Sequence, residues 1–180
     1  CGVDPMTHVD HDPVTRALAG AADSELEGDG SESFLSLNAK LMRAYMDKYR
    51  VRAADFAPFA IAAHRNAVTN PNALLKRSID LDAYLESRTV VDPVRLFDAS
   101  PICDGAAAVV LGSPPALERL ERTARVRIAG SGVATACLAL ARRANLLHLA
   151  AVEASTRQAL AQAELAGRGV PISDVMQLGP

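Results

Sequence analysis

Residues 98–111, with the sequence DASPICDGAAAVVL, carry the most structural information in the chain. A turn of small and polar residues leads directly into the apolar run from Ala106 to Leu111. A short apolar run that follows a turn predicts a core strand buried on both faces. Ser100 offers a hydroxyl in the turn, and Asp104 can accept hydrogen bonds from nearby backbone amides. From these residues alone, the simplest interpretation is a tight turn before a core strand.

Upstream of this stretch, the apolar spacing predicts two helices. One covers 34–49, where aromatic and leucine side chains recur at three- and four-residue steps and form one amphipathic face. The second begins after Asp55, has Pro58 in its first turn, and should end before Asn70-Pro71. The acidic, glycine- and serine-bearing residues 10–33 are predicted to form an exposed loop, because little there can be buried.

Shorter elements flank the central stretch on both sides. A helix or turn is expected over 81–85, followed by a β-branched run over 89–91 that Asp92-Pro93 ends, and a strand is expected over 94–97. After the central strand, Ser113 and Pro114 suit the cap and first position of a helix that would bury Leu117 and Leu120.

The rest of the chain alternates between the two kinds of element. Val126 and Ile128 alternate with arginines, as in a strand with one polar face, and Gly130-Ser131-Gly132 ends it. An alanine-rich helix over 146–166 ends at Gly167, and 170–178 is expected to begin another strand. This order of helices and strands indicates a layered α/β protein.

Composition excludes several classes of protein. The chain has 180 residues, of which 49% are hydrophobic, enough for a buried core. A net charge of −2 gives no electrostatic reason to expect nucleic acid or an anionic membrane as a partner. No apolar run is long enough for a transmembrane helix, and the N-terminus lacks the pattern of a signal peptide. Three widely spaced cysteines favour a reduced, cytoplasmic protein over a disulfide framework.

Three segments together resemble the thiolase family. The central stretch is similar to the family's Ser-Gly-x-Asn-Asp-Gly-Ala-Ala-Ala segment, and Ser100-Pro101 resembles the sterol-carrier-protein and archaeal branch. His64 to Pro71 resembles that branch's His-x-Asn-Ala-x-x-Asn-Pro stretch. Gly2 to Thr7 resembles the Gly-Val-Glu-x-Met-Thr turn of the same family. The segments occur in the family's order and cover most of the chain.

The resemblance implies a thiolase-like layered αβαβα fold, here incomplete, with the loop region and parts of both core halves. Residues 1–9 would end an N-terminal core strand and its turn, and 10–97 would form a largely helical loop region. Residues 98–123 would return to the N-terminal core, and 124–180 would begin the C-terminal core half. Because Cys1-Gly2-Val3 resembles the end of a strand, we expect the chain to begin within a domain.

The resemblance also implies a reaction and a ligand. Thiolases make or cleave 3-ketoacyl-CoA through an acylated cysteine, with acid–base groups and oxyanion-hole donors and without a metal. The serine that aligns with Ser100 lies beside the pantetheine arm of coenzyme A, so Ser100 is the predicted coenzyme A contact. Acyl-CoA is therefore the expected partner, with a homo-oligomer as the expected assembly.

No catalytic residue is predicted within the chain. The family's nucleophilic cysteine lies at a helix N-terminus upstream of the Gly-Val turn, and Cys1 stands where the family has a strand residue. The family's His-Asp-Ala-Phe or Asn-Glu-Ala-Phe segment would follow Leu178, where this chain has Gly179-Pro180. We therefore expect the catalytic residues to lie outside this chain, which alone would be inactive.

Two alternatives remain open at this stage. Thiolase-like proteins of the same branch include lyases that cleave carbon–carbon bonds of CoA thioesters by retro-aldol chemistry, with a small partner protein. The chain would otherwise be a non-catalytic or degenerate thiolase-like interaction protein. The differences between these classes lie mainly in the missing catalytic segments.

Other reactive side chains have simpler interpretations. Cys103 is expected to be a small buried residue, since the charge of Asp104 disfavours a thiolate beside it. His64 ends a helix near the loop region and could line a site, but a structural role is favoured, because a helix C-terminus stabilises a histidine electrostatically. Two further groups are considered, the loop residues His8, Asp10, His11 and Asp12 as a metal cluster, and Arg142-Arg143 as a contact for CoA phosphate. A solvated loop and a helix surface, respectively, are the favoured interpretations.

Overall fold

The computed structural model describes residues 1–27, 32–121 and 126–165. The chain forms two compact units. The first unit comprises residues 1–108 and 138–147, and the second comprises 109–137 and the chain from 148 onward. Helices and short strands occur together, which confirms the α/β class.

The longest helix of the first unit confirms the prediction for residues 34–49. Helix α2 (Phe34–Tyr49) begins at a capping box, in which Ser33 and Ser36 each donate a backbone N–H to the other's hydroxyl oxygen, over 2.7 and 3.0 Å. It ends at Arg50, which has a left-handed backbone with φ of 56°. The predicted apolar face is only partly covered, since Tyr45 and Tyr49 stay exposed and pack on each other.

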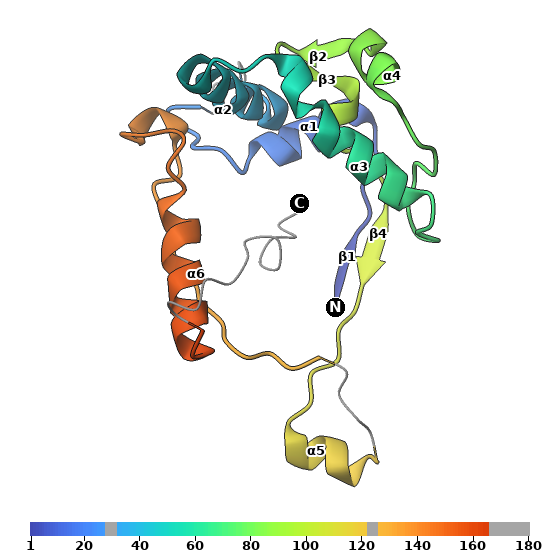
Figure 1. The fold of residues 1–180 in the computed structure, drawn as a ribbon, viewed down its shortest axis with the longest axis vertical. Helices are drawn as coiled ribbons and strands as arrows, with labels where there is room; N and C mark the ends of the chain where they lie inside the picture. Colours follow the sequence, from blue (N-terminus) through green and yellow to red (C-terminus); the bar gives the residue numbers. More distant parts are fainter. Residues whose placement is uncertain (28–31, 122–125, 166–180) are drawn as a thin grey trace. The chain divides into compact units, whose positions relative to one another are not determined.

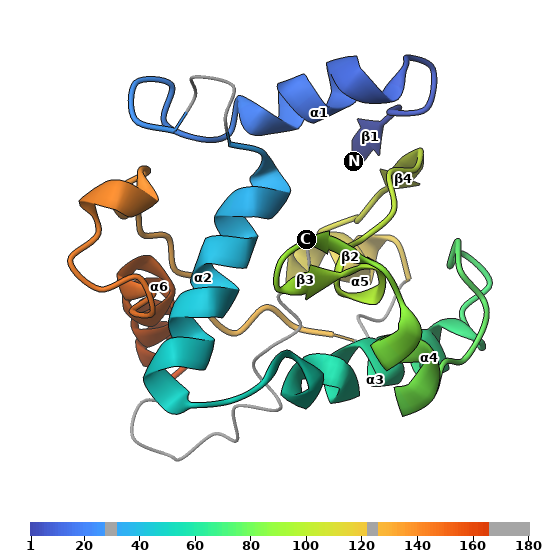
Figure 2. The ribbon, with the colours of Figure 1, turned by 90° about the horizontal axis from the view of Figure 1, so that it is seen from above.

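The exposed-loop prediction for residues 10–33 was wrong in its first half. Helix α1 (His11–Ala19) occupies this segment and buries Val14. Figure 2 shows α1 leading into the N-terminal end of α2, and the two helices are in contact. The acidic composition hid a short helix whose apolar residues Val14 and Leu18 follow helical spacing, and packing against α2 decided the outcome.

A compact core forms where α3 (Ala57–Ala67) packs against α4 (Leu81–Glu86), as Figure 1 shows. A 3₁₀ turn, η1 (Ala53–Phe56), precedes α3, and Pro58 lies in the first turn of α3 as predicted. The helix also ends before Asn70-Pro71 as predicted. The buried members of the core are Ala57, Ala60, Ile79 and Tyr84, with Phe97 partly buried against them.

Two separate antiparallel strand pairs occur in the described residues. Strand β2 (Thr89–Val91) pairs with β3 (Val94–Arg95) across the cis Asp92-Pro93 bond. The strand predicted over 94–97 is shorter because residues Leu96–Asp98 form a 3₁₀ turn, η2. Strand β1 (Gly2–Asp4) lies beside β4 (Gly105–Ala107), although about a hundred residues separate them in the sequence (Figure 1).

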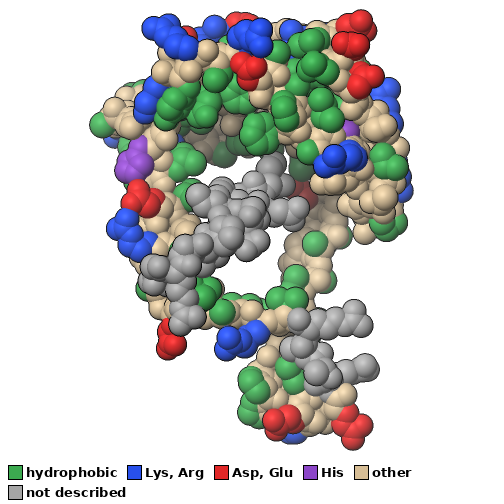
Figure 3. Space-filling view, viewed as in Figure 1, with side chains coloured by type: hydrophobic (Ala, Val, Ile, Leu, Met, Phe, Trp, Pro, Cys, Tyr) green, Lys and Arg blue, Asp and Glu red, His purple; other side chains and the backbone are tan. Residues whose placement is uncertain are grey.

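The central strand is shorter and more exposed than predicted. All three residues of β4 are exposed, and β1 is its partner strand in the described residues. Val109, Val110 and Leu111 follow the strand with 77%, 96% and 72% of their surfaces accessible. Figure 3 shows hydrophobic side chains gathered on the viewed face of the first unit as well. The prediction of a strand buried on both faces was wrong, because burial needs covering layers that the apolar run itself does not supply.

The second unit contains two helices in its described part. Helix α5 (Pro114–Arg119) begins with proline as predicted, but the Ser113 hydroxyl makes no capping bond. Leu117 is half-buried, whereas Leu120 is 68% exposed, so the predicted buried side is incomplete. Helix α6 (Ala150–Gln162) is shorter than the predicted 146–166. The predicted helix end at Gly167 and strand over 170–178 lie outside the described residues.

The strand predicted around Val126 and Ile128 is not formed. Both side chains are exposed, and no strand lies beside them in the described part of the second unit. Alternation alone does not hold a strand without a partner to complete its hydrogen bonds.

The following glycines pack closely on α6. A methyl group at Gly130 or Gly132 would lie 2.1 Å from the carbonyl oxygens of Ala159 and Ser155, respectively. The backbone N–H of Ser131, between them, donates to Gln162 over 2.7 Å. The glycines that were predicted to end a strand therefore permit close packing on a helix.

Across the described ranges, none of the helices combines the length and the apolar character needed to cross a membrane.

The close approach at Gly132 predicts a large effect of a small substitution. Gly132→Ala should lower the free energy of unfolding of the second unit by about 1–3 kcal/mol, because the new methyl group must displace backbone. Thermal unfolding followed by circular dichroism, with hydrogen exchange of the α6 amides, measures this effect. Gly105→Ala is the matched control, since nothing lies within 4 Å of its added methyl group. Equal melting of the two variants would contradict the packing described.

Candidate functional site

The carboxylate of Asp104 holds the N-terminal turn of the first unit. It accepts hydrogen bonds from the backbone N–H of Met6 over 2.7 Å, the backbone N–H of Thr7 over 2.8 Å and the Thr7 hydroxyl over 2.6 Å. Asp104 directly precedes β4, so these bonds close the end of the β1–β4 pair. The accepting role predicted for Asp104 is confirmed, and its donors come from the turn of the Gly2–Thr7 segment.

These donors favour the ionised form of Asp104. The bond from the Thr7 hydroxyl lowers the pKa of the Asp104 carboxyl below 3.8, and the Thr7 and Met6 amides and the charge of nearby His8 act in the same direction. The fully solvated carboxylate therefore stays charged at neutral pH and keeps its three donors.

Ser100 lies on an exposed turn that begins at a well-anchored residue. The turn follows η2, and Ser100 is exposed, as a side chain that meets a ligand must be. Asp98, two residues earlier, accepts the hydroxyl of the fully buried Tyr84 over 2.9 Å and the backbone N–H of Arg95 over 2.8 Å. Burial, and then the bond to Asp98, raise the pKa of the Tyr84 hydroxyl, so this hydroxyl remains a donor.

Arg95 also stabilises the region around the Tyr84–Asp98 hydrogen bond. Its guanidinium donates to the carbonyl oxygens of Leu85 and Ser87, both over 2.8 Å. The same group lies 5.9 Å from the centre of the Tyr84 ring. The end of α4 is thereby tied to the turn before Ser100.

His64 makes structural contacts, and its predicted interaction with the helix C-terminus stays a prediction. It lies in the last turn of α3 and is 8% exposed. Its Nδ1 lies 3.0 Å from the carbonyl oxygen of Arg77, so Nδ1 carries the proton and donates it. The imidazole also meets the Phe97 ring edge-on, with centres 5.2 Å apart. His64 thus joins α3 to η2 and to Arg77, which precedes α4.

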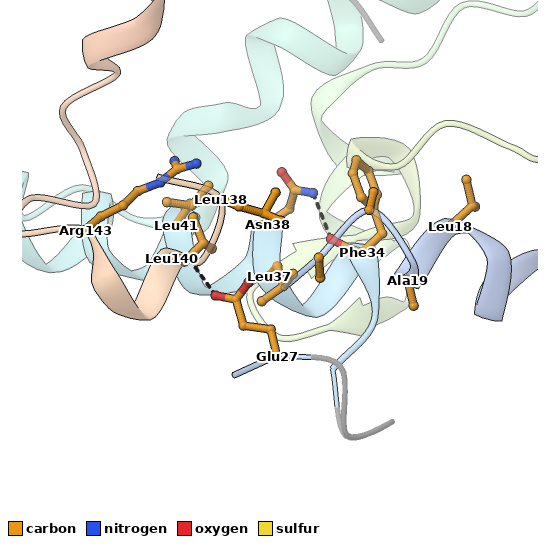
Figure 4. Close-up of a pocket in the computed structure, with 12 residues that line it drawn as sticks. Leu18, Ala19, Glu27, Phe34, Leu37, Asn38, Leu41, Leu138, Leu140 and Arg143 are labelled. Atoms are coloured by element: carbon orange, nitrogen blue, oxygen red, sulfur yellow. Dashed lines mark hydrogen bonds between the residues drawn. The ribbon is translucent and has the colours of Figure 1, made fainter. Parts of the chain in front are cut away.

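A pocket of about 230 Å³ lies beside α2 in the first unit (Figure 4). Its wall is mainly apolar. The lining residues come from the end of α1, the segment that follows it, the first half of α2 and the segment 138–143. They are Leu18, Ala19, Ala21, Ala22, Glu27, Phe34, Leu37, Asn38, Leu41, Leu138, Leu140 and Arg143.

Glu27 joins two distant segments at this pocket. Its side chain is 5% exposed, and one carboxylate oxygen accepts the backbone N–H groups of Leu140 over 2.6 Å and Ala141 over 3.3 Å. These amides lie in η3 (Leu140–Arg142), which is thus held against the rest of the first unit (Figure 4). Glu27 was not predicted as a functional residue, because an acidic residue in an acidic segment carries no sign of a partner 113 residues away.

The cysteines, the possible metal ligands and the arginine pair are the remaining candidate site residues. None of Cys1, Cys103 and Cys137 forms a disulfide, and Cys103 is half-buried rather than buried. The described residues contain no group of three or more His, Cys, Asp or Glu side chains placed to hold a metal ion. Arg142 is exposed at the end of η3, as a helix-surface residue is, whereas Arg143 follows η3 and lines the pocket, so the prediction of a helix surface was wrong for Arg143.

Comparison with known proteins identifies the relatives of the chain. No family model matches it. An acetyl-CoA acetyltransferase of Methanothermobacter thermautotrophicus is 34% identical over 174 residues, which are 97% of this chain and 45% of that protein. A benzoylsuccinyl-CoA thiolase subunit of Thauera aromatica is 36% identical over 132 residues, 73% of this chain and 34% of the relative. A steroid side-chain-cleaving aldolase of Thermomonospora curvata is 35% identical over 89 residues, 44% and 23% of the two chains.

The similarity extends through both units, and the mixed helices and small sheets agree with it. The chain belongs to the thiolase family. It spans less than half the length of the curated relatives it matches.

The Asp104 bonds predict a shift in titration. In Thr7→Val the strongest donor is lost, so the pKa of Asp104 should rise toward 3.8, measured from the carboxyl carbon resonance by NMR. Because the folded-state pKa is depressed, the stability from this carboxylate is present above about pH 4 and is lost as the pH falls through the folded value. As the pH is lowered, the loss of this stability should begin at a higher pH in Thr7→Val than in the native chain. Amide exchange in β1 should therefore start to accelerate at that higher pH.

Thr69→Val is the matched control, since the Thr69 hydroxyl donates to the carbonyl oxygen of Asn66 and not to Asp104. An unchanged Asp104 titration in Thr7→Val would contradict the assignment.

Proposed function

We propose that this chain is the coenzyme A-binding part of a thiolase-type acyltransferase that makes or cleaves 3-ketoacyl-CoA. The similarity to an acetyl-CoA acetyltransferase along 97% of the chain carries this proposal. Ser100 is the proposed contact with the pantetheine arm. Its exposed position on an anchored turn supports that role.

The proposed division of labour leaves bond formation to residues outside this chain. A cysteine thiolate would take the acyl group, and oxyanion-hole donors would stabilise the negative charge on the thioester oxygen. Within this chain, the proposed tasks are to hold the coenzyme and to shape the space for the acyl group. The division into 1–9, 10–97, 98–123 and 124–180 is part of the same proposal.

The pocket beside α2 is the proposed place for the acyl group. Its volume of about 230 Å³ suits a short chain, and leucine, alanine and phenylalanine side chains form most of its wall. Burying methylene groups there contributes about 0.8 kcal/mol each. The pocket would therefore favour acyl-CoA over free coenzyme A.

Assembly and location are proposed on separate grounds. The exposed valine and leucine side chains of 109–111 would be covered in a homo-oligomer or by a small partner protein. Three cysteines without a disulfide are compatible with a reduced, cytoplasmic protein.

A retro-aldol lyase is the second candidate function. The similarity to a steroid side-chain-cleaving aldolase, which covers 44% of the chain, supports this candidate. Thiolysis consumes free coenzyme A, whereas retro-aldol cleavage does not. Turnover of a CoA thioester with and without added coenzyme A, measured with the proposed catalytic residues present, would separate the two reactions. Under those conditions, binding without turnover would favour a non-catalytic interaction protein.

The proposed role of Ser100 predicts a binding defect. Ser100→Trp should weaken coenzyme A binding by about tenfold, because the indole would occupy the space of the pantetheine arm. Isothermal titration calorimetry with the 180-residue chain measures the affinity, and circular dichroism checks the fold. Ser113→Trp is the control, since Ser113 is also exposed and its hydroxyl makes no capping bond. Unchanged affinity in Ser100→Trp would contradict the contact.

The proposed acyl site predicts a selective defect. Leu41→Trp should weaken butyryl-CoA binding by about tenfold and leave the affinity for free coenzyme A unchanged, because the larger side chain fills the pocket. Tyr49→Trp, on the same helix but outside the pocket, serves as the control. Equal losses for the two ligands would show that the pocket does not take the acyl group.

A further inference from the structure

The buried hydroxyl of Tyr84 donates its hydrogen bond mainly to Asp98, two residues before the proposed coenzyme contact Ser100. Tyr84 is fully buried, and its hydroxyl donates to both carboxylate oxygens of Asp98, at 2.9 and 3.0 Å. The carbonyl oxygen of Ala53 lies further away, at 3.4 Å. A hydrogen bond from a buried hydroxyl to a charged acceptor is one of the strong ones, and it restricts where the Asp98 side chain can lie.

The backbone around Asp98 is restrained from two further directions. Arg95 donates its backbone N–H to Asp98 over 2.8 Å, which closes the η2 turn. The ring of Phe97, the residue before Asp98, packs edge-on against His64 and lies 5.7 Å from the guanidinium of Arg77. These contacts fix the direction of the backbone where it leaves the core at Asp98. Ser100 follows two residues later.

We propose that Tyr84 and Asp98 are positioning residues for Ser100, and through it for the pantetheine arm of coenzyme A. Neither side chain touches the ligand in this assignment. Tyr84 fixes Asp98, Asp98 fixes the turn, and the turn presents the Ser100 hydroxyl. The inference rests on the proposed function, since it gives Ser100 a ligand to meet.

The chemistry of the pair explains why a tyrosine suits this place. A phenylalanine would fill the same core volume and would leave the Asp98 carboxylate without its buried donor. An exposed carboxylate can turn to water, so the loss would loosen the turn more than it would destabilise the core. A positioning role therefore predicts a change in local order and ligand affinity that exceeds the change in global stability.

The experiment compares Tyr84→Phe with Ser87→Ala in the full 180-residue chain. The Ser87 hydroxyl donates to the backbone carbonyl oxygen of Tyr84 over 2.6 Å, so the control removes a hydrogen bond at the same residue without touching Asp98. Hydrogen exchange of the Arg95 and Ala99 amides, which donate to Asp98 and to the carbonyl oxygen of Leu96, reports the η2 turn, and calorimetry with coenzyme A reports the site. Tyr84→Phe should speed exchange and weaken binding by about tenfold each, with Ser87→Ala near the native values.

A second variant guards against a general loss of packing. Asp98→Asn keeps one acceptor oxygen, so its exchange and affinity should fall between those of the native chain and Tyr84→Phe. Equal effects of Tyr84→Phe and Ser87→Ala, or faster exchange without weaker binding, would overturn the positioning role. If the native chain fails to bind coenzyme A, the proposed function fails, and exchange of the Arg95 and Ala99 amides alone then decides whether Tyr84 orders the η2 turn.

Discussion

The hydrogen bond from the buried Tyr84 hydroxyl to Asp98 is the interaction on which the first unit depends most. It joins the core of α3 and α4 to the turn that leads toward β4. Arg95 reinforces it through its backbone amide and through its contacts with the end of α4. A buried hydroxyl must have a partner, and here that requirement sets the path of the backbone outside the core.

The carboxylate of Asp104 restrains the other end of the segment that begins at Asp98. Asp104 collects three donors from Met6 and Thr7, and so holds the turn after β1 against the start of β4. Ser100 lies between the two anchored aspartates. The proposed coenzyme contact is therefore exposed but sits in a segment restrained at both ends, which is the usual requirement for an ordered binding residue.

Local signals predicted much of the helical structure and little of the burial. Apolar spacing located α2, and Pro58 and Asn70-Pro71 bracketed α3, because these signals act within a few residues. Val109 to Leu111 were predicted to be buried because they are apolar, yet they are exposed. Burial depends on covering elements, so an apolar run cannot determine it alone. Glu27 shows the same limit, since its amide partners lie over a hundred residues away.

The sequence by itself determined the family, through three segments whose residues could be compared in order. It also determined that Asp104 would accept backbone amides, since an aspartate in a turn before a strand has that local chemistry. Only the tertiary structure decided which amides these are, that Tyr84 anchors Asp98, and that Glu27 holds the pocket wall. Those contacts join residues far apart along the chain, and their geometry exists only after the backbone has brought the segments together.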